Sequence, residues 1–219
     1  AARRAAPLVL ALTVDPAGQT RPIYPAFVSA AGPNASGYAL LPVEPDGVVR
    51  RFDERIGADG SAVPTFAGQL ARRLGGTAGH GVIDFGVGEE FTYVPLHTVL
   101  EWQGAGDGGK LERAFKGKVV LLGSVLKFED RLAAPVNLTA WDPYAINVPG
   151  VVLHAQVLRN LLGAGPIMPL PNWVVLLLCL LPFGALADTA ATAAAPAAGA
   201  KSDEDKVVFA IGQLVSRGL

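Results

Sequence analysis

The chain has 219 residues and a formal net charge of −1, from 18 basic and 19 acidic side chains. This balance gives no positive field for a polyanion, so we exclude nucleic acid as a partner. Charged residues make up only 17% and the mean hydropathy is +0.37, which favours association with a membrane. The single cysteine, Cys179, excludes an intrachain disulfide, and the three scattered histidines give no metal-ligand spacing.

The first third of the chain contains strand-like and helical patterns. Residues 7–15 (PLVLALTVD) predict a buried strand that ends at a Pro- and Gly-rich turn. Residues 38–52 predict a β-hairpin, because the pair Asp46 and Gly47 lies between two apolar runs and tolerates the backbone of a tight turn. Apolar residues at every fourth position predict an amphipathic helix over 64–75.

The middle of the chain continues this alternation. It predicts strands over 81–85 and 91–95, and helical turns over 95–102 and 111–115. The stretch KGKVVLLGS (116–124) then predicts a buried strand that ends in Gly-Ser. Strands that alternate with helices favour an α/β fold with a largely parallel sheet, flanking helices and one β-hairpin.

A Pro-punctuated loop is expected over 125–148, and the strongest helix signal of the chain follows it over 149–163. Pro149 begins this helix and Gly163 ends it. The helical spacing predicts that one face is apolar, with Val151, Ala155, Leu158 and Leu162.

An uncharged segment near the carboxyl end, WVVLLLCLLPFGALA, predicts a transmembrane helix over 171–187. At about 1.5 Å per residue this helix is roughly 25 Å long, somewhat less than a hydrocarbon core of about 30 Å. Pro182 supports the alternative of a buried core helix, whereas Trp173 and the scarcity of charge support the membrane. An Ala-rich linker is expected over 188–201 and an amphipathic helix over 202–219.

Several motifs follow one another in an order that is more specific than any one of them. A Lys-Gly-Lys strand ends in Gly-Ser, an Asp and a Pro follow, and a Pro-Gly-Val helix carries His-Ala; a turn with Asp-Gly and Arg lies upstream. The residues are Lys116, Gly117, Lys118, Gly123, Ser124, Asp130, Pro135, Pro149, Gly150, His154, Ala155, Asp46, Gly47 and Arg50. Over about residues 8–187 the chain resembles the CHASE type 2 domain, an extracellular sensory module of cyclases and histidine kinases.

The resemblance implies a ligand-sensing region over residues 1–165, on the periplasmic or extracellular side of the cell inner membrane, and incomplete at its amino terminus. It implies a small-molecule or protein ligand, a homodimer, no cofactor and no catalytic residue. A full-length parent is then expected to carry the output, such as an adenylate cyclase or a kinase. A structural or dimerisation domain of a membrane protein is the alternative function, and a hydrolase that uses Ser124 is the second alternative.

Two residues at the end of the predicted strand 116–124 are candidates for ligand binding. Gly123 permits a close approach of the backbone, and Ser124 offers a hydroxyl at the carboxyl edge of a parallel sheet, where open α/β folds bind ligands. Ser124 could equally cap or turn the loop. The next candidate is Asp130, whose carboxylate either contacts ligand or stabilises its own loop, with Arg131 beside it as a neutralising partner.

His154 and Arg50 complete the candidate ligand site. His154 faces apolar neighbours on its helix, so it is either a core histidine or a pH-sensitive link to Asp130. Arg50 lies on the predicted hairpin, where a solvated edge is the alternative. A triad of Ser124, His154 and Asp130 has the residue types of a hydrolase, but GSVLK lacks the Gly-x-Ser-x-Gly turn. No residue is predicted to bind a metal.

Overall fold

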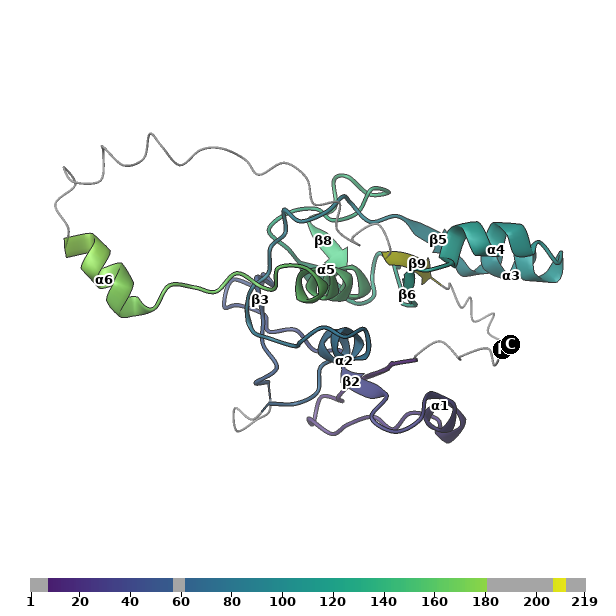
Figure 1. Cartoon of the computed structure of the whole chain (residues 1–219), viewed down its shortest axis with the longest axis horizontal. Helices are drawn as coiled ribbons and strands as arrows, with labels where there is room; N and C mark the ends of the chain where they lie inside the picture. The colour runs from purple at the N-terminus through teal and green to yellow at the C-terminus, as the bar shows by residue number, and fades with distance from the viewer. Residues whose placement is uncertain (1–7, 57–61, 181–206, 212–219) are drawn as a thin grey trace.

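In the computed structural model, which describes residues 8–56, 62–180 and 207–211, six helices accompany four small β-sheets (Figure 1). The helices are α1 (Pro25–Ala31), α2 (Phe66–Arg73), α3 (Leu96–Gly104), α4 (Gly108–Phe115), α5 (Gly150–Leu162) and α6 (Asn172–Leu180). The strands are β1 (Leu10–Leu12), β2 (Ser36–Tyr38), β3 (Arg51–Phe52), β4 (Gly81–Val82), β5 (Tyr93–Pro95), β6 (Val119–Leu121), β7 (Arg131–Ala133), β8 (Asn147–Pro149) and β9 (Val207–Ile211).

Parallel pairing is present, but it is divided between two sheets. Strand β1 pairs with β2, and β9 lies between β5 and β6, in each case parallel. The other two sheets, β3–β4 and β7–β8, are antiparallel. The predicted α/β class is therefore confirmed. The prediction of one largely parallel sheet is not, because β1 and β6 are hydrogen-bonded to different partners and do not pair with each other.

The predicted hairpin over 38–52 forms its turn without its ladder. The Glu44 amide donates to the Val48 carbonyl over 3.0 Å, and Gly47 has a φ of +83°, as a tight turn requires. The flanking strands then separate, since β2 pairs with β1 and β3 pairs with β4. The Val49 amide donates to Ala133 at 2.9 Å, so a contact distant in sequence replaces the local pairing.

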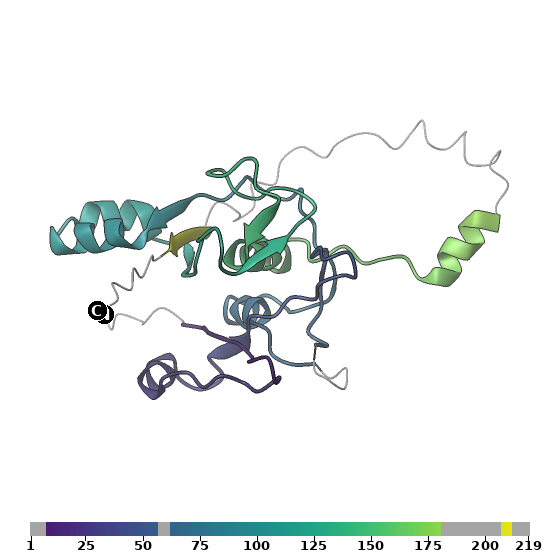
Figure 2. The same ribbon diagram turned by 180° about the vertical axis from the view of Figure 1, so that it is seen from behind.

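Helix α2 matches the helix predicted over 64–75. Thr65 is its N-cap, and the Thr65 hydroxyl accepts a hydrogen bond from the Gly68 amide at 3.1 Å. Gly75, just beyond its end, has a φ of +86° that favours glycine. The helix packs against α5 in the centre of the molecule (Figures 1 and 2).

Helix α5 is the core of the described part of the chain. The predicted bounds 149–163 agree with the observed Gly150–Leu162, and Val151, Ala155 and Leu158 of the predicted apolar face are buried. Every residue from 150 to 161 is buried, because α2 covers one side and the strands and loops cover the others, whereas Leu162 is 40% exposed. A helix surrounded in this way has no solvent face for its polar side chains.

Two antiparallel strands interrupt the loop expected over 125–148. Strands β7 and β8 pair with Leu132 opposite Val148, and β8 leads directly into α5. The predicted helical turns upstream are confirmed and are longer than expected, as α3 and α4. These two helices pack side by side and project from the body (Figures 1 and 2).

The carboxyl-terminal predictions have mixed outcomes. Helix α6 begins where the membrane helix was expected and stands apart from the body in both views (Figures 1 and 2). Within the described ranges, no helix combines the length and apolar character needed to cross a bilayer. Residues 181–187 and the linker 188–201 lie outside those ranges. The helix predicted over 202–219 is wrong for Val207–Ile211, which form β9, and β-branched residues in that stretch favour a strand.

Candidate functional site

The end of strand β6 lies directly against the start of helix α5. A Cβ atom added to Gly123 would be 2.7 Å from the Cβ of Val151 and 2.8 Å from its Cγ2. Only a residue without a side chain permits this approach, so the prediction of a close backbone approach at Gly123 is confirmed. The neighbour that comes close is helix α5 of the same domain.

Ser124 turns the loop that follows β6. Its Oγ accepts a hydrogen bond from the Leu126 amide at 3.3 Å and donates to Glu129 Oε2 at 3.4 Å. These two hydrogen bonds correspond to the alternative role of Ser124, in which its hydroxyl holds the shape of the loop. This pattern is a local Ser turn, which is a common use of a serine after a strand.

Asp130 closes the same loop onto the amino terminus of α5. Its carbonyl accepts from the Gly150 amide at 2.8 Å, and its carboxylate oxygens occupy the space where a side chain at Gly150 would lie. Partial burial there raises the pKa of the Asp130 carboxyl. The backbone of Asp130 has a φ of +46°, which short polar residues tolerate.

Arg131 does not neutralise Asp130. Its guanidinium donates to three backbone carbonyls, those of Leu126, Val125 and Asn147, at 3.0, 2.9 and 2.9 Å. These bonds tie the loop after Ser124 to strand β8. The loop is therefore fixed from two sides, by Asp130 at α5 and by Arg131 at β8.

His154 lies one turn into α5 and faces α2. Its imidazole meets the Phe66 ring edge-on, with centroids 5.6 Å apart. Burial lowers its pKa from 6.5 to about 4, against a smaller opposing effect of the Ala39 backbone. His154 is thus a neutral core histidine, and no contact links it to Asp130 in the described residues.

The low pKa of His154 predicts a loss of stability in mild acid. A folded pKa of about 4 lies below the unfolded value of 6.5, so stability is complete above pH 6.5 and falls as the pH falls toward 4. Between pH 7.5 and pH 5.0 we expect a loss of about 2 kcal/mol in the free energy of unfolding. The raised pKa of Asp130 acts in the opposite sense, with its largest effect at lower pH.

Urea unfolding of the wild type and of His154→Gln at the two pH values measures this effect. The variant cannot titrate at this position, so its pH dependence should be smaller by most of that amount. Equal pH dependence in the two proteins would contradict the assignment. His80 and His97 are exposed and are unchanged in the variant.

Arg50 does not join the other candidates. Its guanidinium pairs with Glu44 and Asp46, each at 2.7 Å, beside the turn that Gly47 makes. Arg51 also reaches Glu44, at 3.1 Å. The hydrogen bond from Arg50 lowers the pKa of the Asp46 carboxyl. Arg50 is therefore part of a surface ion-pair cluster, as in the alternative of a solvated edge.

A buried polar cluster on α5 was missed from the sequence. Gln156 Nε2 donates to the Asp84 carbonyl at 2.7 Å, and Asn160 both donates to that carbonyl and accepts from the Asp84 amide. Arg159 Nη1 donates to the carbonyls of Val87 and Glu89. The signal was the spacing of Gln, Arg and Asn at i, i+3 and i+4 inside an apolar helix, which places three polar groups together on one side.

The assembled residues form a structural joint with no catalytic geometry among the described side chains. Ser124 bonds to Leu126 and Glu129, and His154 contacts Phe66, so the nucleophile-and-base pair of a hydrolase is not assembled. Within the residues that the structure describes, His, Cys, Asp and Glu form no group of three or more that could hold a metal ion. The joint connects the end of β6, the following loop and the start of α5.

Comparison with known proteins identifies the family. The family model for the CHASE2 domain matches residues 3–187. No curated protein and no solved structure shows significant similarity to the chain. The match covers strands β1 to β8, the joint and helix α5, in agreement with the motifs around Gly123 and His154, and strand β9 lies beyond it. The chain therefore belongs to the CHASE2 family, and it is an extracellular sensory domain with a sensor role in signalling.

Proposed function

We propose that this chain is the ligand-sensing region of a receptor in the cell inner membrane. Residues 1–165 lie on the periplasmic or extracellular side, and the receptor drives a cytoplasmic output such as a nucleotide cyclase or a histidine kinase. The chain itself performs no chemistry. Ligand binding shifts α5, and the segment after Gly163 passes this displacement to a membrane helix over 171–187.

The observation that supports this proposal is the exposed apolar surface of α6. Trp173, Leu176 and Leu177 are 68%, 62% and 55% exposed, and the helix carries no charged residue. Water does not stabilise a surface of this kind, whereas a lipid bilayer does, with Trp at its interface. Because α5 is connected to α6 through a short segment, a shift of α5 would reach the membrane directly.

A change of signal requires two arrangements with different affinity for the ligand. The joint at the amino terminus of α5 supplies the site where the arrangement can differ. Gly123 packs on Val151, and Asp130 packs on Gly150, so a shift of the loop after β6 moves the helix with it. The residues proposed to bind the ligand are Gly123, Ser124, Asp130, His154 and Arg50. His154, a residue of α5 buried against Phe66 of α2, would act through its packing.

Membrane anchorage predicts a clear effect of a charge in α6. Leu177→Arg should move the chain from the carbonate-resistant membrane fraction to the soluble fraction, since a central Arg costs about 3 kcal/mol on insertion. Leu177 is exposed, so the substitution leaves the globular body intact. The matched control is Val136→Arg, at a residue that is 45% exposed on the body. Membrane association that survives Leu177→Arg unchanged would contradict the anchor.

Sidedness is tested with a single cysteine on the body. In a Cys179→Ala background, Tyr144→Cys places a thiol at a residue that is 93% exposed. A membrane-impermeant maleimide should label this thiol in intact cells from which the outer barrier has been removed. If the thiol is labelled only after lysis of the cytoplasmic membrane, the domain lies on the cytoplasmic side, which would contradict the proposed receptor.

Self-association is the second candidate role, and one observation favours it. Phe128, Tyr144 and Ile146 are almost fully exposed in the loops around β7 and β8, and large exposed apolar side chains are typical of protein interfaces. A homodimer is compatible with a receptor. A thermal-shift screen with a broad metabolite collection separates the roles, because a ligand at about 100 times its Kd adds about 2.7 kcal/mol. No stabilisation by any compound would favour a scaffold over a sensor.

A further inference from the structure

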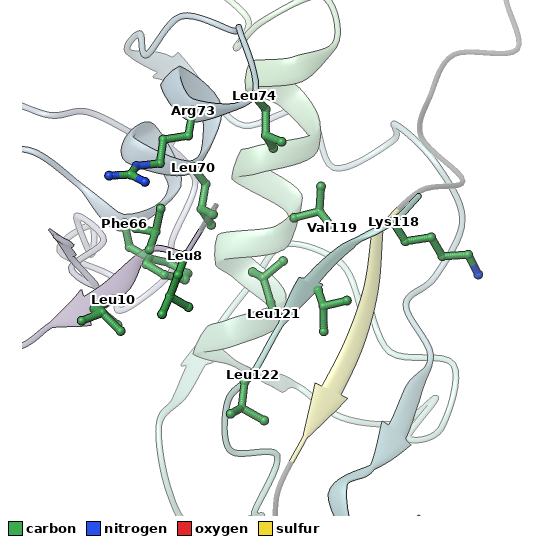
Figure 3. A pocket seen from close by; sticks show the side chains of 13 residues that line it. Leu8, Leu10, Phe66, Leu70, Arg73, Leu74, Lys118, Val119, Leu121 and Leu122 are labelled. Atoms are coloured by element: carbon green, nitrogen blue, oxygen red, sulfur yellow. The ribbon is translucent and has the colours of Figure 1, made fainter. Parts of the chain in front are cut away.

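Strand β9 lies between β5 and β6 and runs parallel to both, and Figure 3 shows it beside β6. Tyr93 of β5 and Leu121 of β6 both pair with Phe209. Within the described residues, β5 and β6 pair with no other strand, so β9 joins them into one sheet. Strand β6 also borders an apolar groove of about 460 Å³ (Figure 3), which is lined by residues from 8–11, 66–74 and 118–122.

The two neighbours of β9 are firmly part of the body. Tyr93 packs edge-on against Trp141, with ring centroids 4.8 Å apart. Leu121 is 1% exposed and belongs to the core around α5, and Gly123 just beyond it packs on Val151. Residues 207–211, which pair with both strands, are therefore held on the body itself.

The order of the elements along the chain limits how the apolar segment can meet a bilayer. Helix α6 follows α5 and precedes β9, so the chain leaves the body after Leu162 and is back on it at Val207. Both ends of the intervening stretch thus lie on the same side of a membrane. A single crossing by residues 171–187 would place β9 on the side opposite to β5 and β6. The pairing of β9 and a single crossing therefore exclude each other.

The dimensions of α6 fit attachment from one side. Its nine residues span about 14 Å at about 1.5 Å per residue, which is roughly half of a hydrocarbon core of about 30 Å. Trp173 lies in the first turn and is 68% exposed, as suits a residue at the membrane interface. Two residues after Leu180, the sequence has Pro182, which lacks the amide that a continuing helix needs. Helix α6 thus has the length of one leaflet.

From this topology we propose that α6 inserts into the leaflet that faces the body, and that residues 171–187 do not cross the bilayer. The inference rests on the membrane attachment proposed above and replaces a crossing by this segment with attachment from one side. A crossing that leads to the cytoplasmic output then belongs to another part of the receptor. The membrane segment is connected to α5 at one end and, through β9, to β6 at the other. These are the two elements that meet at the joint, so a shift of α5 relative to β6 changes the distance between the two attachments.

Cysteine labelling on the full chain tests the side on which the chain returns. In the Cys179→Ala background, Tyr144→Cys reports the side of the body, and Ser202→Cys reports the stretch before β9. A membrane-impermeant maleimide, added to intact cells from which the outer barrier has been removed, should label the two thiols equally. A crossing by residues 171–187 would instead protect Ser202→Cys until the cytoplasmic membrane is lysed.

A disulfide tests the pairing of β9 in the native membrane. Val120 and Val208 are partners in the register of β6 and β9. Neighbouring strands lie about 4.8 Å apart, which is within the Cα separation that a disulfide bridges. Oxidation of Val120→Cys with Val208→Cys, again in the Cys179→Ala background, should therefore link the strands, as peptide mapping would show. Tyr144→Cys with Val208→Cys is the control and should form no such link, because Tyr144 lies outside this sheet.

Protection of Ser202→Cys in cells that label Tyr144→Cys would overturn the inference and leave the proposed sensor with a crossing helix. Absence of the disulfide would also overturn it, because β9 would then not hold the chain on the body. If neither thiol is labelled before lysis and the disulfide forms, attachment from one side is supported and the proposed sidedness of the receptor is wrong. The inference and the proposed function therefore fail on different results.

Discussion

Arg159→Ala is expected to lower the free energy of unfolding by about 3–4 kcal/mol. Arg159 is buried, and its Nη1 donates to Val87, Glu89 and Gln156 Oε1 at 3.0–3.1 Å. The guanidinium also lies 4.0 Å from the centroid of the Phe91 ring. Alanine removes this buried guanidinium with its donors and its contact with Phe91, and the Val87 carbonyl keeps only the bond from Gln156 Nε2.

The loop 84–91 should detach from α5 in this variant. Arg159→Lys keeps the charge but cannot reproduce the planar arrangement of donors, so we expect an intermediate loss. Chemical denaturation measures the stability, and amide exchange of residues 84–91 measures the attachment of the loop. Arg51→Ala is the matched control, because Arg51 is exposed and its pair with Glu44 should contribute less than about 1 kcal/mol. A loss no larger than that of the control would contradict the role assigned to Arg159.

Gly123→Ala is expected to cost about 2–3 kcal/mol, although it adds one methyl group. The new Cβ would lie within 3.1 Å of three atoms of Val151, which is a β-branched residue with a stiff side chain. Relief requires β6 and α5 to move apart at the joint, which disturbs the packing of the core. Gly104→Ala is the control, since a Cβ at Gly104 meets nothing within 4 Å and alanine favours the helix.

A double-mutant cycle assigns the effect of Gly123→Ala to the contact with Val151. Val151→Gly removes all three contacting atoms, at the cost of its own burial and helix propensity. The two substitutions together should therefore cost about 1–2 kcal/mol less than the sum of their separate effects. Strict additivity, measured by urea unfolding at pH 7.5, would mean that the strain lies elsewhere.

Two exposed apolar features have no role in the fold itself. The groove between β1 and β6 and the surface of α6 both leave aliphatic side chains in water. We propose a bilayer for the second, which the joint and α5 reach through the segment after Gly163. The polar cluster of Gln156, Arg159 and Asn160 holds α5 from the side of loop 84–91 and limits its movement there.

Local sequence determined the elements whose signals are local. Thr65 and Gly75 delimit α2, Gly47 makes its turn, and Pro149 and Gly163 delimit α5, because caps and backbone preferences act within a few residues. The order of motifs from Lys116 to Ala155 also sufficed to identify the CHASE2 family. The close approach of the backbone at Gly123 followed from the residue type.

Only the tertiary structure decided which elements meet. It separated β2 from β3, added β7 and β8, and surrounded α5, because strand pairing and burial depend on segments far apart in the chain. It turned His154 toward Phe66 and left Arg50 on the surface, because a helical or strand position fixes a direction and not a neighbour. The groove belongs to three segments at once, so no single stretch of sequence could reveal it.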